Sequence, residues 1–172
     1  AFAWSLMAVP RDLEARAWYE LAFWGGGHVL QFAWTLLLLV AWLLLADASG
    51  VRVPISPRVV ALLFGIQLVA VFATTLVYLA YDVTSVEHHR LQTWLMRLGG
   101  ALAIPVVALA VVLGLVRRSR AGPVPAQAKP LLAALVVSLV LFCTGGAIGF
   151  LIEGSNVRIP AHYHGAIVGV TI

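Results

Sequence analysis

Long apolar stretches alternate with short polar segments along this chain, and the pattern predicts membrane-spanning helices. Four stretches are long enough to cross a hydrocarbon core, which needs about 20 helical residues. They run approximately over 18–46, 57–81, 91–116 and 130–152. A fifth apolar stretch begins at Pro160 and continues over 160–172. We therefore predict an all-α fold: a polytopic transmembrane helix bundle with four complete spans and the start of a fifth, forming a single transmembrane domain over 1–172.

Charged and turn-forming residues separate the apolar stretches. These separating segments are 47–50, Asp82, 117–120 and 153–156. Residues 1–9 form a short apolar segment without the basic leader of a signal peptide. Because the chain starts at Ala1 and its fifth stretch is too short to span a bilayer, we expect a fragment of a longer polytopic protein.

Composition supports a membrane location and excludes several classes of protein. Of the residues, 62% are hydrophobic and 10% are charged, with a mean hydropathy of +1.01. Ordinary soluble domains carry about 25% charged residues. This excess of hydrophobic over charged residues argues against a soluble enzyme, a disordered tail, a nucleic-acid-binding module and a disulfide-rich secreted domain. The single cysteine, Cys143, cannot form an internal disulfide.

The basic residues are sorted along the chain, which predicts an orientation. The connection over 117–129 contains basic residues and no acidic ones. The positive-inside rule therefore places this loop in the cytoplasm. Alternation of the spans then places the segments 82–90 and 153–159 on the outer side. The net charge of +4 thus fits membrane topology better than nucleic-acid binding.

All five histidines fall in the outer half of the predicted membrane. His28 lies early in the first span, and the pair His88 and His89 lies just before the third. His162 and His164 lie in the first turn of the fifth. Polar groups at membrane depth are costly and usually functional. Neutral imidazole is a common ligand for copper, iron and zinc.

Each histidine also has a simpler interpretation. His28 follows Gly25–Gly27, so it could make a hydrogen bond between closely packed helices. The adjacent pair His88 and His89 could be interfacial. His162 and His164 are two positions apart and point about 200° away from each other on a regular helix. They therefore cannot bind one metal from one face, but they could serve two separate cofactors.

Three motifs, taken in order, resemble the catalytic subunit of the heme-copper oxidase superfamily. They are Trp24–Val29 with its Trp-Gly-Gly-Gly-His-Val sequence, the pair His88–His89, and Ala161–His164 with its His-Tyr-His sequence. The resemblance covers roughly 18–172. It corresponds to the sixth through early tenth helices of a twelve-helix core.

The resemblance implies a set of cofactor ligands. His28, His88 and His89 would bind the active-site copper. His162 would bind the iron of a high-spin heme, and His164 the iron of a low-spin heme. The second axial ligand of the low-spin heme would come from a helix that this chain lacks, so the chain alone is expected to be inactive.

The implied function is that of a terminal respiratory oxidase that reduces dioxygen to water. Its partners would be other oxidase subunits and an electron donor such as cytochrome c, a cupredoxin or a quinol. The implied location is a prokaryotic cell membrane, with the histidines toward the outer side.

One departure from the family pattern leaves alternatives open. Many of these oxidases carry a tyrosine one turn after the first copper ligand, where this chain has Phe32. Tyr81 is our candidate for the catalytic tyrosine, and Tyr78 is a second one. If neither tyrosine reaches the site, the sequence favours nitric oxide reduction over dioxygen reduction. Glu87 and Gln31 could then help to hold a non-heme iron in place of copper. Two further alternatives are a membrane heme protein that only relays electrons and a non-enzymatic membrane protein.

Overall fold

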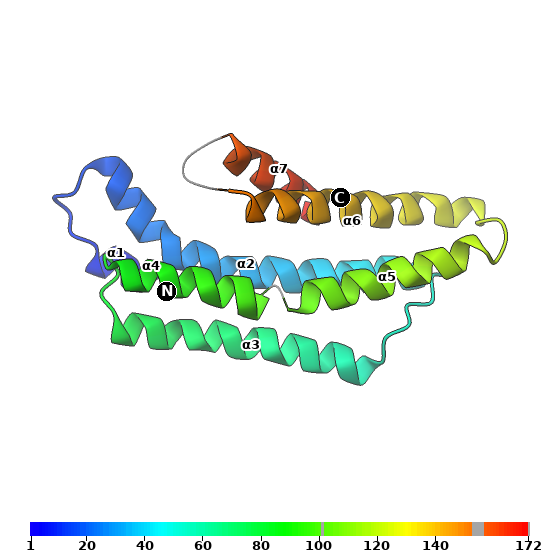
Figure 1. Ribbon diagram of the computed structural model, residues 1–172, viewed down its shortest axis with the longest axis horizontal. Helices are drawn as coiled ribbons and strands as arrows, with labels where there is room; N and C mark the ends of the chain where they lie inside the picture. Colours follow the sequence, from blue (N-terminus) through cyan, green and yellow to red (C-terminus); the bar gives the residue numbers. More distant parts are fainter. Residues whose placement is uncertain (101, 153–156, 172) are drawn as a thin grey trace. The chain divides into compact units, whose positions relative to one another are not determined.

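A computed structural model describes residues 1–100, 102–152 and 157–171, and its regular structure there is entirely helical. Figure 1 shows the elements. They are α1 (Phe2–Ala8), α2 (Ala15–Ala48), α3 (Pro57–Ala80), α4 (Val86–Leu95), the π-helix η1 (Met96–Gly100), α5 (Ala103–Ser119), the 3₁₀-helix η2 (Ala126–Ala128), α6 (Lys129–Phe150) and α7 (Arg158–Thr171).

The predicted all-α class is confirmed. Four helical segments are long and apolar enough to cross a membrane, so the chain is an integral membrane protein by length and composition. They are Ala15–Ala48, Pro57–Ala80, Val86–Ser119 and Ala126–Phe150. The helix Arg158–Thr171 occupies the predicted fifth stretch. The predicted turn at 153–156 and the terminal residue 172 lie outside the described residues.

Local sequence explains where α3 begins. Ser56 is its N-cap, and the Ser56 hydroxyl accepts a hydrogen bond from the Val59 backbone N–H at 3.3 Å. Pro57 follows at the first helical position, where a missing N–H does no harm. The predicted boundary at residue 57 therefore coincides with the observed one.

Two features differ from the sequence prediction. Residues 2–8, expected only as a short apolar segment, form the helix α1. The third span begins at Val86 rather than at residue 91, because Ser85 caps α4. This span also changes to a π-helix at Met96–Gly100, where two consecutive glycines weaken the preference for a regular α-helix.

The described chain divides into two compact units. Unit 1 comprises Ala1–Leu36 and Ser56–Val107, and unit 2 comprises Leu37–Ile55 and Ala108–Ile172. His28, His88 and His89 belong to unit 1, whereas His162 and His164 belong to unit 2. The single transmembrane domain over 1–172 stays a prediction, and the two units are described separately below.

In unit 1, α3 packs against α4 and η1, as Figure 1 shows. The backbone of Gly99 in η1 lies so close to Ala70 of α3 that a Cβ atom at Gly99 would overlap the Ala70 methyl group. The same hypothetical Cβ atom would lie 3.6 Å from the ring of Phe32 in α2. Segments of α2, α3 and η1 therefore meet at Gly99.

In unit 2, glycines bring α6 and α7 into backbone contact. A Cβ atom at Gly165 of α7 would lie 2.8 Å from the Cα atom of Gly145 of α6. Beyond this contact, the buried Ser138 hydroxyl donates to the Gly169 carbonyl and accepts a 2.8 Å hydrogen bond from the Trp42 indole. Small residues and interhelical hydrogen bonds are the usual means of packing helices in membranes.

We predict that Gly145→Val separates α6 from α7, because the added atoms would meet the backbone of Gly165 at 2.7 Å. Overpacking of this kind costs about 1–3 kcal/mol. The free energy of unfolding, measured by denaturant titration in detergent micelles, should fall by that amount. Gly146→Val is the matched control, since a Cβ atom at Gly146 meets nothing within 4 Å. Equal losses in the two variants would contradict this account of the α6–α7 contact.

Candidate metal centre

The first turn of α4 carries the two adjacent histidines of unit 1. Ser85 caps this helix, and its hydroxyl accepts a 3.1 Å hydrogen bond from the His88 backbone N–H. The His89 ring nitrogen Nδ1 lies 3.1 Å from the Ser85 carbonyl oxygen. The pair therefore lies inside a capped helix rather than in the loop before it, and His88 is fully buried.

Trp24 of α2 brings the third histidine of unit 1 into the same region. The Trp24 ring lies 4.6 Å from the His28 ring and 4.9 Å from the His89 ring, measured between ring centroids. The rings of His88 and His89 are 6.2 Å apart. The structure thus brings His28 and His89 to the Trp24 ring and His88 beside His89, and we call these four residues the Trp24 cluster.

Tyr78 of α3 completes the surroundings of His88. Its ring meets the His88 ring edge-on, with centroids 4.6 Å apart and planes at 86°. Its hydroxyl group is 2.9 Å from the Ser5 hydroxyl of α1. Gly25 is required here, because a Cβ atom at that position would overlap the Tyr78 hydroxyl.

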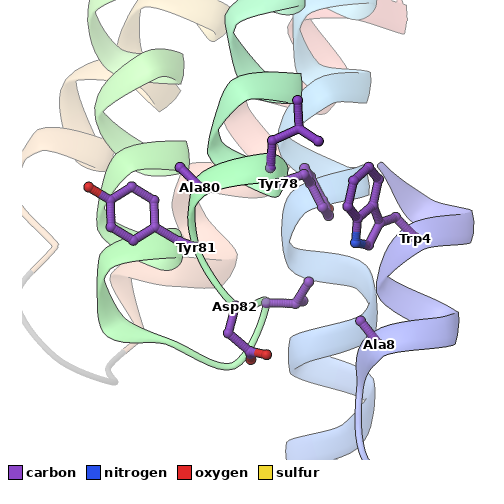
Figure 2. A pocket seen from close by; sticks show the side chains of 8 residues that line it. Trp4, Ala8, Tyr78, Ala80, Tyr81 and Asp82 are labelled. Carbon is purple, nitrogen blue, oxygen red and sulfur yellow. The ribbon is translucent and has the colours of Figure 1, made fainter.

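The two candidate tyrosines therefore have different environments. Tyr78 is 5% exposed and contacts His88, whereas Tyr81 is 41% exposed. Figure 2 shows Tyr78 beside Trp4, while the Tyr81 ring is directed away from them. Of the two, the structure brings Tyr78 to the histidines.

Four histidines direct Nδ1 at a backbone carbonyl. The pairs are His28 with Trp24 at 2.6 Å, His89 with Ser85 at 3.1 Å, His162 with Gly145 at 2.7 Å, and His164 with Pro160 at 2.7 Å. A carbonyl can only accept, so Nδ1 must carry the proton in each pair. In the neutral ring this leaves the Nε2 lone pair available, which is the arrangement that a metal-binding imidazole requires.

His88 is the exception. Among the described residues, neither of its ring nitrogens has a hydrogen-bond partner of normal geometry. The Tyr81 backbone carbonyl lies near the ring but outside hydrogen-bond geometry. Leaving a buried polar group unsatisfied costs about 1–3 kcal/mol. An imidazole kept in this position needs another partner.

The Trp24 cluster is not arranged as a finished metal site. Within 1–100, 102–152 and 157–171, no three His, Cys, Asp or Glu side chains form a group that could hold a metal ion. The Trp24 ring contacts both His28 and His89. The three imidazoles would have to turn toward a common point to bind one ion.

In unit 2, the two histidines of α7 have different surroundings, as their spacing predicts. His162 faces α6 and lies over Gly149, where a Cβ atom would come within 2.7 Å of His162 Nδ1. His164 is exposed, and so is Tyr163 between them. The glycines of α6 thus make room for the His162 ring.

The residues considered for a non-heme iron are not gathered in the same way. Glu87 is exposed in the first turn of α4. The Gln31 side-chain oxygen is buried and has no hydrogen-bond partner among the described residues. Phe32, at the position of the missing tyrosine, is buried against Gly99.

Sequence reasoning missed three residues of this region. They are Ser5, Trp24 as a contact of two histidines, and Gln92, which is fully buried one turn after His88 on α4. Ser85 is a preferred N-cap residue, and this signal could have placed the histidine pair inside a helix. The spacing of Trp24 and His28 also puts their side chains on one helix face. Nothing in the sequence indicates that Ser5 bonds to Tyr78, 73 positions later.

The turn that precedes α4 depends on Asp82. The Thr84 hydroxyl and backbone N–H both donate to the Asp82 carboxylate, the latter at 2.8 Å. These hydrogen bonds hold the pKa of Asp82 below its usual range. A carboxylate with a lowered pKa stabilises the folded state above its unfolded pKa of about 3.9 and loses that contribution as the pH falls through its folded pKa.

We therefore predict that acid loosens the turn that leads to His88. Hydrogen–deuterium exchange of the amides of 83–88, corrected for intrinsic rates, should lose protection below about pH 4. Asp82→Asn should show reduced protection already at neutral pH, whereas Asp12→Asn, in the exposed segment before α2, should behave as the wild type. A wild-type protection pattern in Asp82→Asn would contradict this role.

Comparisons with known proteins leave the function open. No family model matches the chain, and no solved structure shows significant similarity to it. An uncharacterized protein of Rickettsia prowazekii (strain Madrid E) is 29% identical over 201 aligned residues, covering 99% of this chain and 39% of that protein. An uncharacterized protein of Aquifex aeolicus (strain VF5) is 30% identical over 165 residues, covering 95% of this chain and 38% of that protein. The chain therefore spans less than half the length of these curated relatives.

Proposed function

We propose that this chain forms the metal-binding core of a membrane oxidoreductase, a terminal respiratory oxidase that reduces dioxygen to water. One observation carries the proposal. His28 and His89 contact the Trp24 ring, and the neighbouring His88 is fully buried with neither ring nitrogen in a hydrogen bond of normal geometry among the described residues. A polar group of this kind inside a membrane protein is a functional-site hypothesis by default.

The chemical type of the donors suits copper once the three imidazoles turn toward a common point. His28 and His89 each have Nε2 free to bind, because Nδ1 is used by a backbone carbonyl. His88 can offer either nitrogen. Imidazole ligands suit copper, and backbone carbonyls are typical partners for the second nitrogen of a metal-binding histidine. The copper would therefore be held by His28, His88 and His89.

Tyr78 takes the place of Tyr81 as the tyrosine of the proposed site. It touches His88, and Ser5 together with Gly25 fixes its hydroxyl. Its phenol is thus able to hold or release a proton next to the copper ligand. This contact favours dioxygen reduction over nitric oxide reduction, for which the exposed Glu87 would have been the expected iron ligand.

The histidines of α7 would serve as ligands of two hemes. His162 would bind the high-spin iron and His164 the low-spin iron, each through Nε2, since both Nδ1 atoms face backbone carbonyls. When bound, the hemes and the copper supply the electrons that dioxygen reduction consumes. The protein residues contribute ligand identity, orientation and protection from water.

The rest of the assembly follows from this proposal. The low-spin iron would need its second ligand from outside the chain, and the electrons would come from cytochrome c, a cupredoxin or a quinol. The chain would lie in a prokaryotic cell membrane, with the basic loop 117–129 in the cytoplasm and the histidines toward the outer side.

Metal content tests the copper ligands. Full-length protein purified without added chelator should contain copper, and His88→Ala should lose it. Glu87→Gln is the matched control, because Glu87 is the exposed neighbour of His88, and it should retain copper. Iron in place of copper, lost on Glu87→Gln, would instead indicate a nitric oxide reductase. Heme without any histidine-dependent second metal would indicate a protein that only relays electrons.

Optical spectra test the heme ligands. In the full-length protein, His162→Ala should remove the heme that binds carbon monoxide after reduction and leave the low-spin spectrum in place, and His164→Ala should do the reverse. Tyr163→Phe, between them on the exposed surface of α7, should leave both spectra unchanged. The same spectrum in both histidine variants would exclude this assignment.

A further inference from the structure

Several buried polar atoms of unit 1 lack hydrogen-bond partners among the described residues. Gln92, fully buried on α4, lacks a partner for both Oε1 and Nε2. The Trp24 indole N–H and the Gln31 side-chain oxygen, both on α2, are buried and unpartnered in the same way. Together with His88, these residues place unsatisfied groups on two helices of one unit.

Helix register shows that these residues follow one seam. Gln92 is one turn after His88 on α4, so the two lie on the same helix face. On α2, Trp24 contacts His89, and Phe32 lies against Gly99. Contacts at both ends thus join the segment 24–32 of α2 to the segment 89–99 of α4 and η1, and Gln31 and Gln92 lie between these two contacts in the sequence.

A metal bound by the histidines would not satisfy this seam. It would occupy one ring nitrogen of His88 but would leave the amide of Gln92, the oxygen of Gln31 and the indole N–H of Trp24 without partners. Lipid offers no hydrogen bonds, so the satisfying groups must lie inside the protein. A second ligand is therefore needed in addition to any metal.

The chemistry of the unpartnered atoms defines this ligand. The Trp24 indole can only donate, the Gln31 oxygen can only accept, and the Gln92 amide does both. A simple cation or anion would match only half of these groups. Water donates and accepts, and buried water molecules typically make about three hydrogen bonds to such groups.

A pocket at the end of α3 lies next to this seam. It has a volume of about 270 Å³, and its walls come from Trp4 and Ala8 of α1 and from 78–83. Figure 2 shows it from close by. Tyr78 lines the pocket and also contacts His88, so one side chain separates the pocket from the first buried group of the seam.

We propose that Gln92, Gln31, Trp24 and His88 bind a file of ordered water molecules that exchanges with the solvent through the pocket beside Tyr78. The file hydrates the interior of unit 1 from the end at which α3 terminates and α4 begins. This inference does not require the metals or the oxidase activity proposed above.

Radiolytic hydroxyl labelling of the full-length protein tests the proposal, because hydroxyl radicals generated from bound water oxidise adjacent side chains. His88 should be oxidised although it is fully buried. Trp42 is the internal control: it is equally buried, but its indole already bonds to Ser138. Trp42 should stay unmodified, even though indole is the more reactive ring.

Variants separate the water file from general exposure. Gln92→Leu should lower His88 labelling several-fold with Trp42 still protected, whereas Gln92→Glu, whose carboxylate still accepts hydrogen bonds from water, should retain most of it. After rapid mixing with ¹⁸O-water, Ala8→Trp should reduce the ¹⁸O content of oxidised His88 by blocking the pocket. Unlabelled wild-type His88, or full labelling in Gln92→Leu with Trp42 protected, would overturn the water file. An unchanged ¹⁸O content in Ala8→Trp would overturn the route.

Discussion

Unit 1 depends on the contacts of one side chain, Tyr78. Its hydroxyl reaches Ser5 of α1, its ring lies against His88 of α4, and it occupies the space left by the missing side chain of Gly25 on α2. Four helical segments therefore meet at a residue that is itself part of α3. The Ser5 hydroxyl gives the buried Tyr78 hydroxyl a partner inside the protein, as a membrane protein requires of its polar groups. Ser85 caps the helix that carries His88, and the His88 ring packs edge-on against Tyr78.

The contact between Tyr78 and His88 connects the packing of the helices to the candidate metal centre. The helices bring imidazoles, amides and an indole into a region that apolar side chains would otherwise fill, and several of these groups are not satisfied by their protein neighbours. Such groups reduce the stability of the chain alone. Metal ions and water would supply the missing partners of these groups and so offset the loss of stability. Both proposals rest on this reasoning. Unit 2 shows the contrasting case, in which Trp42, Ser138 and Gly169 satisfy one another fully.

The sequence predicts the helices better than it predicts the site. Apolar length alone locates four spans, because a bilayer demands that length, and the start of α3 is visible in Ser56 and Pro57. The sequence also places His162 and His164 on different faces. It does not choose between Tyr78 and Tyr81, since that choice depends on how α1 and α2 pack against α3. The helix α1 likewise depends on contacts between distant residues, such as the hydrogen bond between Ser5 and Tyr78.

The central claim is that His28, His88 and His89 form one copper site. Copper X-ray absorption on the full-length protein tests it most directly, because multiple scattering from imidazole rings reports how many histidines bind the metal. We expect three imidazoles in the wild type and, in His88→Ala reconstituted with excess copper, one fewer. An imidazole count that does not change in His88→Ala, or copper bound without imidazole, would contradict it.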